Sequence, residues 1–253
     1  MRAYELMKET FFRKMYIYIV HLSWFAIYGL FLVLFAREED DFYRIFFIWG
    51  GFLLPLTLSA GIFGDDLASG RICVLATRPF WLGELYIYRL LGLSAQAAVH
   101  FILAGCLLLI VHHFISIGST DNLGSWLLSS WLLFNTWAAL STSLSVVVKR
   151  AYNFVFLLAA FLFFGFLNSA MSWYNPNETM TDVIKAFVKY ACPPFGLLTK
   201  LAQGEYSKYS LIVGQYSAIK AVACVTHCFV LTAFYGLVGV LILNRRQFTC
   251  SQE

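Results

Sequence analysis

The sequence predicts an all-α integral membrane protein with six transmembrane helices. Apolar residues make up 60% of the 253 residues, and charged residues make up only 13%. A soluble domain carries about 25% charged residues, so much of this chain needs lipid rather than water as its solvent. The chain also divides into six apolar stretches of about 20 residues, the length that crosses a bilayer.

Residues 1–14 predict an amphipathic helix that lies in the membrane interface, an elbow helix before the first span. Its charged face holds Arg2, Glu5, Lys8, Glu9 and Arg13, and its less polar face holds Ala3, Leu6, Met7, Thr10 and Phe11. This separation is typical of helices that lie flat on a bilayer. A short cytoplasmic extension of the first span is the alternative.

The six spans cover about 15–36, 45–63, 90–115, 124–148, 151–173 and 217–243. Lys and Arg gather on one side of the membrane, at Arg2, Lys8, Arg13, Lys14, Arg71, Arg78, Arg89, Lys149, Arg150, Arg245 and Arg246. The short loops on the other side hold only Arg37 and Arg44. Because positive charge marks the cytoplasmic side, both termini are expected in the cytoplasm.

The polar stretch 64–79, between spans two and three, predicts a short cytoplasmic helix. Asp65 and Asp66 suit a helix N-terminus, Arg78 suits the last turn, and Pro79 prevents continuation. Its apolar side is formed by Leu67, Ile72, Val74 and Leu75. Such a helix is shaped to dock in a groove of a partner protein, although an interfacial linker lying on the headgroups has the same pattern.

The segment 174–216, before the last span, predicts an external helical hairpin. Apolar residues recur at helical spacing in 181–190, a Pro-Pro corner follows at Pro193 and Pro194, and 195–202 is again apolar. Two short helices dipping into the outer leaflet fit this pattern, and a surface loop is the alternative.

Several function classes are excluded by what the sequence lacks. All fourteen acidic residues can be placed outside the hydrocarbon core, with the basic residues at span ends, whereas ion-coupled carriers need a titrating group at bilayer depth. The chain has no P-loop, Ser-His-Asp or zinc-protease signature, so it is not expected to be an enzyme. It also lacks the basic cluster of a nucleic-acid-binding domain.

No cofactor or metal site is expected in this chain. Cys224, His227 and Cys228 share one helix face, and a soft metal or haem would accept such residues. A packed helix face with buried thiols explains the same spacing and is the favoured interpretation.

The layout resembles the permease subunits of type 2 (ABC-2) exporters, six-span proteins that pair with separate ATPases. The resemblance is carried by the segment 4–9, by Asp65-Asp66 followed by Gly70-Arg71, by the run 75–79, and by Glu84 and Arg89. That family usually has a glutamate near Asp65 or Asp66, a serine-proline ending where Arg78-Pro79 stands, and a lysine where Arg89 stands.

The resemblance implies a dimer of permeases, homomeric or built from two related chains, with two ATPase subunits that hold ATP and Mg. It implies a multi-pass protein of the bacterial cytoplasmic (inner) membrane. The residues implied to contact the ATPase are Asp65, Asp66, Leu67, Gly70, Arg71, Val74, Leu75 and Arg78. The elbow helix, with Arg2, Glu5, Lys8 and Arg13, would provide a pivot.

The substrate path implied by the resemblance follows spans one, two and five. Its candidate aromatic lining is Trp24, Tyr28, Phe46, Trp49, Phe156 and Phe163. An aromatic lining suits a hydrophobic or amphiphilic substrate, although lipid-facing surface is also rich in aromatic residues.

Two other functions remain open at this point. In the first, the same fold and ATPase drive a protein outside the membrane without passing a solute, as a mechanotransmitter. In the second, the chain is a membrane assembly factor, or a cofactor anchor that uses Cys224, His227 and Cys228.

Overall fold

The computed structural model describes residues 2–13, 54–59, 61–71, 81–115, 123–148, 152–160, 162–163, 198 and 211–245. The named helices are α1 (Arg2–Arg13), α4 (Leu54–Leu58), α5 (Ile62–Ala68), α7 (Leu82–Ile115), α8 (Leu123–Ser145) and α12 (Leu211–Arg245). This part of the chain contains no strand, so the predicted all-α class is confirmed for it.

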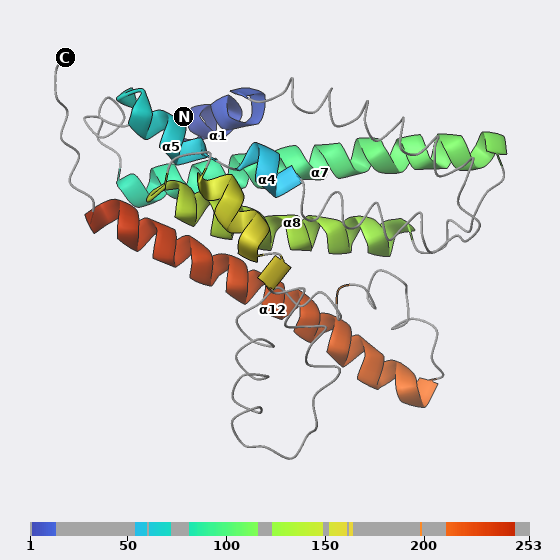
Figure 1. Cartoon of the computed structure of the whole chain (residues 1–253). Helices are drawn as coiled ribbons and strands as arrows, with labels where there is room; N and C mark the ends of the chain where they lie inside the picture. Colours follow the sequence, from blue (N-terminus) through green and yellow to red (C-terminus); the bar gives the residue numbers. More distant parts are fainter. Residues whose placement is uncertain are drawn as a thin grey trace, which may run out of the picture.

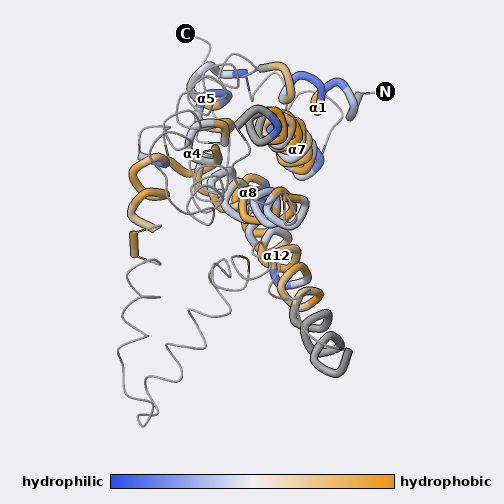
Figure 2. The backbone as a smooth tube through the Cα atoms, turned by 90° about the vertical axis from the view of Figure 1, so that its right-hand side faces the viewer, coloured by the Kyte–Doolittle hydropathy of each residue, from blue (hydrophilic) through white to orange (hydrophobic). Residues whose placement is uncertain are grey.

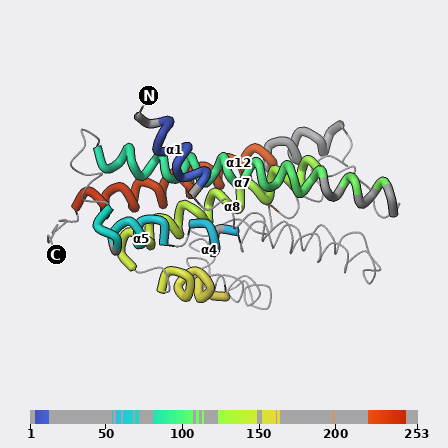
Figure 3. Tube along the Cα trace, turned by 90° about the horizontal axis from the view of Figure 1, so that it is seen from above, coloured from blue at the N-terminus to red at the C-terminus, as the bar shows by residue number. Residues whose placement is uncertain are grey.

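Three long helices, α7, α8 and α12, form the body of the molecule. Figure 1 shows α8 and α12 running in the opposite direction to α7, with α8 packed against both of the others. The helices α1 and α5, the start of α7 and the end of α12 all lie at one end of this bundle (Figures 1 and 3). We call it the charged end because the ion pairs described below lie there.

Two of the helices contain segments that are long and apolar enough to cross a membrane, Leu82–Cys106 in α7 and Ala221–Arg245 in α12. Their outer faces are apolar, and side chains such as Ile102, Val222 and Leu237 are 59%, 65% and 62% exposed. Figure 2 shows the apolar colouring along both helices. Exposed apolar surface of this kind needs lipid around it, so these helices indicate a membrane protein.

The number of spans stays a prediction. The first predicted span, 15–36, lies outside the described residues, as does most of the second. Part of the fifth is described, and residues 152–160 are helical there. The predicted external hairpin also lies outside them, apart from Leu198 and the start of α12.

The start of α7 corrects the predicted start of span three. The helix begins at Leu82, eight residues before the expected position near Leu90. Leu85, Tyr86 and Arg89 are all buried, so this first part of α7 already packs against the rest of the molecule. The prediction was wrong because it took Arg89 as the end of a polar loop.

Two glycines interrupt helices that the sequence predicted to be continuous, one before α5 and one after it. Gly61 has φ 74° and stands between α4 and α5, so the predicted span 45–63 is not one helix to its end. Gly70 has φ 66°, and α5 ends at Ala68 instead of continuing to Arg78. Glycine adopts this left-handed backbone without the strain that a side chain causes, which explains both breaks.

The amphipathic character of α1 is confirmed. Glu5 and Lys8 are exposed, whereas Leu6 and Thr10 are 7% and 2% exposed because α1 packs on α7. The two backbones come close at Gly92 of α7. A Cβ atom there would stand 2.8 Å from Thr10 Cβ and 2.9 Å from the Met7 carbonyl oxygen.

We expect Gly92→Ala to loosen α1. The added methyl group meets backbone as well as side chain, so α1 has to move away from α7. Amide hydrogen exchange in residues 2–13 should accelerate about tenfold, which corresponds to about 1.4 kcal/mol of lost local stability. Gly124→Ala is the control, because nothing lies within 4 Å of a Cβ at Gly124. Unchanged exchange in Gly92→Ala would show that α1 does not depend on this contact.

Candidate functional site

A fully buried arginine organises the charged end of the bundle. Arg89 of α7 is 0% exposed, and its guanidinium donates to Asp66 Oδ2 of α5 at 3.1 Å. It also donates to the Thr10 hydroxyl of α1 at 2.9 Å and, through both terminal nitrogens, to Glu9 Oε1 at 3.3 Å. One side chain therefore holds groups from three helices together.

Glu9 extends this network to the turn after α5. Its Oε1 atom also pairs with Arg71 at 2.8 Å. The side chains of Arg71 and Glu9 are 43% and 32% exposed, so this outer pair is in contact with water. Glu9, Asp66, Arg71 and Arg89 form what we call the charge cluster, with two positive and two negative groups.

The cluster explains how a charged arginine is accommodated inside α7, within the candidate span Leu82–Cys106. A buried ion is very costly unless a counter-ion and hydrogen bonds replace its water. Asp66 is also 0% exposed and supplies that counter-ion, while Glu9 and Thr10 take further guanidinium N–H groups. Asp66 depends on Arg89 in turn, because loss of the arginine would leave its buried carboxylate without this counter-ion.

Local structure positions Asp66 and Arg71 for these contacts. The Gly70 amide donates to the Leu67 carbonyl at 3.2 Å, and the Ser69 hydroxyl donates to the Asp65 carbonyl at 2.8 Å. These bonds close the end of α5, and the left-handed conformation of Gly70 then turns the chain. Arg71, the next residue, lies within reach of Glu9 on α1.

A second set of contacts fixes α5 and α7 to the rest of the bundle. The rings of Phe63 and Tyr86 are stacked, with centroids 5.4 Å apart. The Tyr86 hydroxyl lies 2.8 Å from the hydroxyls of both Thr142 and Ser143 on α8. The Phe63 amide donates to Ser145 Oγ at 3.4 Å. Consequently α5 is connected to α8 as well as to α7 and α1.

The structure describes five of the eight predicted ATPase-contact residues. Asp66 is buried, Asp65 and Leu67 are half-buried, and Gly70 and Arg71 are exposed at the end of α5. The remaining three lie outside the described residues, and these are Val74, Leu75 and Arg78.

Asp65 and Asp66, both predicted at a helix N-terminus, have different positions in the structure. Gly61 occupies the N-cap position of α5 and Asp65 lies in its first turn, so a favourable place near the positive end of the helix is found for Asp65. Asp66 instead points its carboxylate at Arg89.

The other predicted site residues are only partly described. Phe156 and Phe163 are 54% and 56% exposed, while the other four pathway candidates lie outside the described residues, and these are Trp24, Tyr28, Phe46 and Trp49. In the elbow helix Arg2 and Arg13 are helical, but their side chains are outside the described part.

Sequence reasoning gave no site role to the two residues that matter most here. Glu9 was assigned to the charged face of the interfacial helix, Arg89 was placed at a span end, and both entered only through the segments that carry the family resemblance. A signal for Arg89 exists in the sequence, because it follows Leu85 and Tyr86 at the spacing of one helix face. A cation on an otherwise apolar face needs an acidic partner.

Cys224 and Cys228 are buried free thiols in an apolar cluster with side chains that include Leu133 and Trp137. His227 on the same helix is half-buried. Within the described ranges no three His, Cys, Asp or Glu side chains are grouped so that they could hold a metal ion.

The charge cluster is suited to a mechanical role. It joins α1, α5 and α7 by ion pairs and a hydrogen bond, and it leaves Gly70 and Arg71, where the chain turns after α5, on the surface. Through Glu9, these ion pairs connect the surface at Arg71 to α7, which contains a candidate membrane span. No protein-family model matches the chain, and no curated protein matches it either.

Proposed function

We propose that this chain is the membrane subunit of an ABC exporter of the type 2 class. It works as a dimer of permeases with two separate ATPase subunits and moves a hydrophobic or amphiphilic substrate out of the cytoplasm or the inner leaflet. The observation that carries the proposal is the charge cluster, which ties the amphipathic helix α1 and the segment after α5 to α7.

The position of the cluster supports a cytoplasmic energy source. The positive-inside pattern of the sequence puts the charged end on the cytoplasmic side. The helices α1 and α5, the start of α7 and the end of α12 all meet there (Figure 1). The surface turn that ends at Gly70 leads through Arg71 into 72–79, the rest of the proposed coupling segment, which lies outside the described residues. A soluble ATPase reaches this end without entering the membrane.

The proposed mechanism follows from these connections. ATP binding closes the ATPase dimer, and the coupling segment moves with it. Because Arg71, Glu9 and Arg89 are linked, the motion reaches α1 and α7 together. Tyr86 passes it on to α8. The whole charged end then moves as one unit relative to the remaining spans, which is a rigid-body transition rather than a local one.

The proposal predicts an ATPase partner. The tagged chain, expressed at native level and purified in mild detergent, should carry with it a soluble protein that has a P-loop motif, identified by mass spectrometry. The control is a tagged membrane protein of similar abundance from the same membranes. Purification of the chain without any P-loop protein, under conditions that keep known membrane complexes intact, would contradict the proposal.

Gly70 offers a test of coupling that leaves the charge cluster in place. We expect Gly70→Val to reduce substrate-stimulated ATP turnover of the complex by about tenfold, because valine strains the left-handed turn. Gly70→Asn is the matched control, since asparagine tolerates this conformation and nothing lies within 4 Å of a Cβ there. Equal turnover in both variants would show that the turn does not transmit force.

A further inference from the structure

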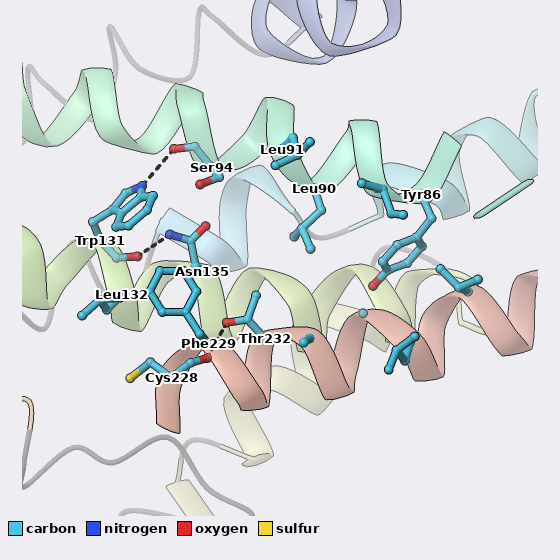
Figure 4. A pocket seen from close by; sticks show the side chains of 15 residues that line it. Tyr86, Leu90, Leu91, Ser94, Trp131, Leu132, Asn135, Cys228, Phe229 and Thr232 are labelled. Atoms are coloured by element: carbon cyan, nitrogen blue, oxygen red, sulfur yellow. Dashed lines mark hydrogen bonds between the residues drawn. The ribbon is translucent and has the colours of Figure 1, made fainter. Parts of the chain in front are cut away.

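A groove between α7, α8 and α12 lies apart from the charge cluster. Its volume is about 500 Å³, within the range of small-molecule sites. Leu90 and Leu91 of α7, Leu132 of α8 and Phe229 of α12 give it mostly apolar walls (Figure 4). Its α7 and α12 walls belong to the two segments that are long and apolar enough to cross a membrane.

Asn135 of α8 is the polar residue whose hydrogen bonding is incomplete in this groove. The side chain is only 9% exposed, and its amide nitrogen donates to the Trp131 carbonyl at 2.8 Å. That bond fixes the orientation of the Asn135 amide, because the Trp131 carbonyl oxygen can accept a hydrogen bond from Nδ2 but not from Oδ1. The Asn135 Oδ1 atom accepts no hydrogen bond from the described residues and faces the groove in Figure 4.

Two of the neighbouring polar groups already have partners. The Trp131 indole donates to the Ser94 carbonyl at 3.1 Å, and the Thr232 hydroxyl donates to the Cys228 carbonyl at 2.8 Å. The Thr232 oxygen keeps a lone pair, so it can accept a hydrogen bond but has no proton left to donate. Neither group donates to Oδ1 of Asn135, so a ligand that brings its own donor can satisfy that atom.

The uncharged lining around Asn135 restricts that donor to a neutral group. None of the residues that line the groove around Asn135 carries a charge. A charged group would find no counter-ion there and would have a high desolvation cost, whereas a hydroxyl group has a low cost once it is hydrogen-bonded.

We propose that this groove binds a lipophilic alcohol, a neutral molecule with a long hydrocarbon body and one hydroxyl group. The hydroxyl group of the ligand donates a hydrogen bond to Asn135 Oδ1. Its hydrocarbon body lies along Leu90 and Leu91 toward Tyr86. The stretch of α7 from Tyr86 to Ser94 is about 12 Å long, which accommodates an extended chain segment. This site does not depend on an ATPase partner and is distinct from the path proposed along spans one, two and five.

The test uses the purified full chain in phosphatidylcholine nanodiscs and two photoreactive probes. One probe is hexadecanol carrying a diazirine, and the other is the matched alkane without the hydroxyl. Labelled residues are mapped by mass spectrometry. We expect the alcohol to label α7, α8 and α12 residues of the groove about fivefold more than the alkane, the preference that one neutral hydrogen bond provides.

Three variants make the result specific. Ala233→Trp fills the groove from α12 and should abolish labelling by both probes, whereas Val230→Trp, on the same helix but outside the groove, should leave labelling unchanged. Asn135→Leu should remove the preference for the alcohol while alkane labelling continues. Equal labelling of the wild-type groove by the two probes, or unchanged alcohol labelling in Ala233→Trp, overturns the proposal.

Discussion

Replacing Arg89 by leucine is expected to lower the free energy of unfolding by about 3–5 kcal/mol. The substitution leaves Asp66, which is 0% exposed, without its counter-ion in the interior. It also removes the bonds that hold Glu9 and Thr10 of α1 against α7. The effect can be measured by titrating the purified protein with SDS in mixed micelles and following tryptophan fluorescence.

Two further variants separate the cluster from a general loss of packing. Removing both buried charges, in the double variant Arg89→Leu with Asp66→Leu, should recover most of the loss because no unpaired ion remains. Arg71→Leu removes the outer cation, whose side chain is 43% exposed, and should cost about 1 kcal/mol or less. If Arg89→Leu costs no more than Arg71→Leu, the buried cluster does not hold these helices together.

Gly239→Val is expected to destabilise the chain by about 3 kcal/mol, the upper end of what overpacking costs. A Cβ atom at Gly239 of α12 would stand 2.5 Å from the ring atom Cε2 of Tyr86 and 2.6 Å from the Tyr86 hydroxyl oxygen. The Tyr86 ring cannot move aside, because Tyr86 is 1% exposed, its ring is stacked on Phe63, and its hydroxyl is hydrogen-bonded to Thr142 and Ser143. The helix α12 must therefore move away from α7.

Gly236 provides the matched control on the same helix. A Cβ there would lie 3.9 Å from the Tyr86 ring, an ordinary van der Waals distance. Gly236→Ala should leave the stability unchanged or raise it by about 1 kcal/mol, since alanine is the better helix former. The two variants can be compared in the same SDS titration. Similar losses in both would mean that the close approach at Gly239 is not what limits α12.

The sequence alone predicted the helical class and the amphipathic α1 correctly, because both depend on periodicity and composition. It failed at the two ends of α5. There the deciding factor is the left-handed backbone of Gly61 and Gly70, and neither glycine is distinguishable in the sequence from one that lies inside a helix.

The charge cluster was predictable only in part. Asp66 and Arg71 were identified as candidate functional residues, whereas their partners Glu9 and Arg89 entered only through the family resemblance and were given no site role. The missing information is tertiary, since Glu9 and Arg89 are separated by 80 positions and meet only when α1 packs on α7. Residue pattern can show that a buried cation needs a partner, but it cannot show which acid is brought to it.

The central claim is that the charge cluster passes motion from a cytoplasmic ATPase to the membrane helices. The direct test places a spin label at Phe156→Cys, an exposed position, in both copies of the dimer. The six native cysteines are replaced beforehand. The distance between the two labels is then measured by pulsed electron paramagnetic resonance, with the ATPase bound, in the presence and absence of ATP.

We expect ATP to change the label-to-label distance in the otherwise native chain. In the double variant Arg89→Leu with Asp66→Leu, which should remain folded, the distance should stay constant while the ATPase still binds. An equal ATP-dependent change in the native and the double-variant complexes would contradict the claim that the cluster transmits the motion.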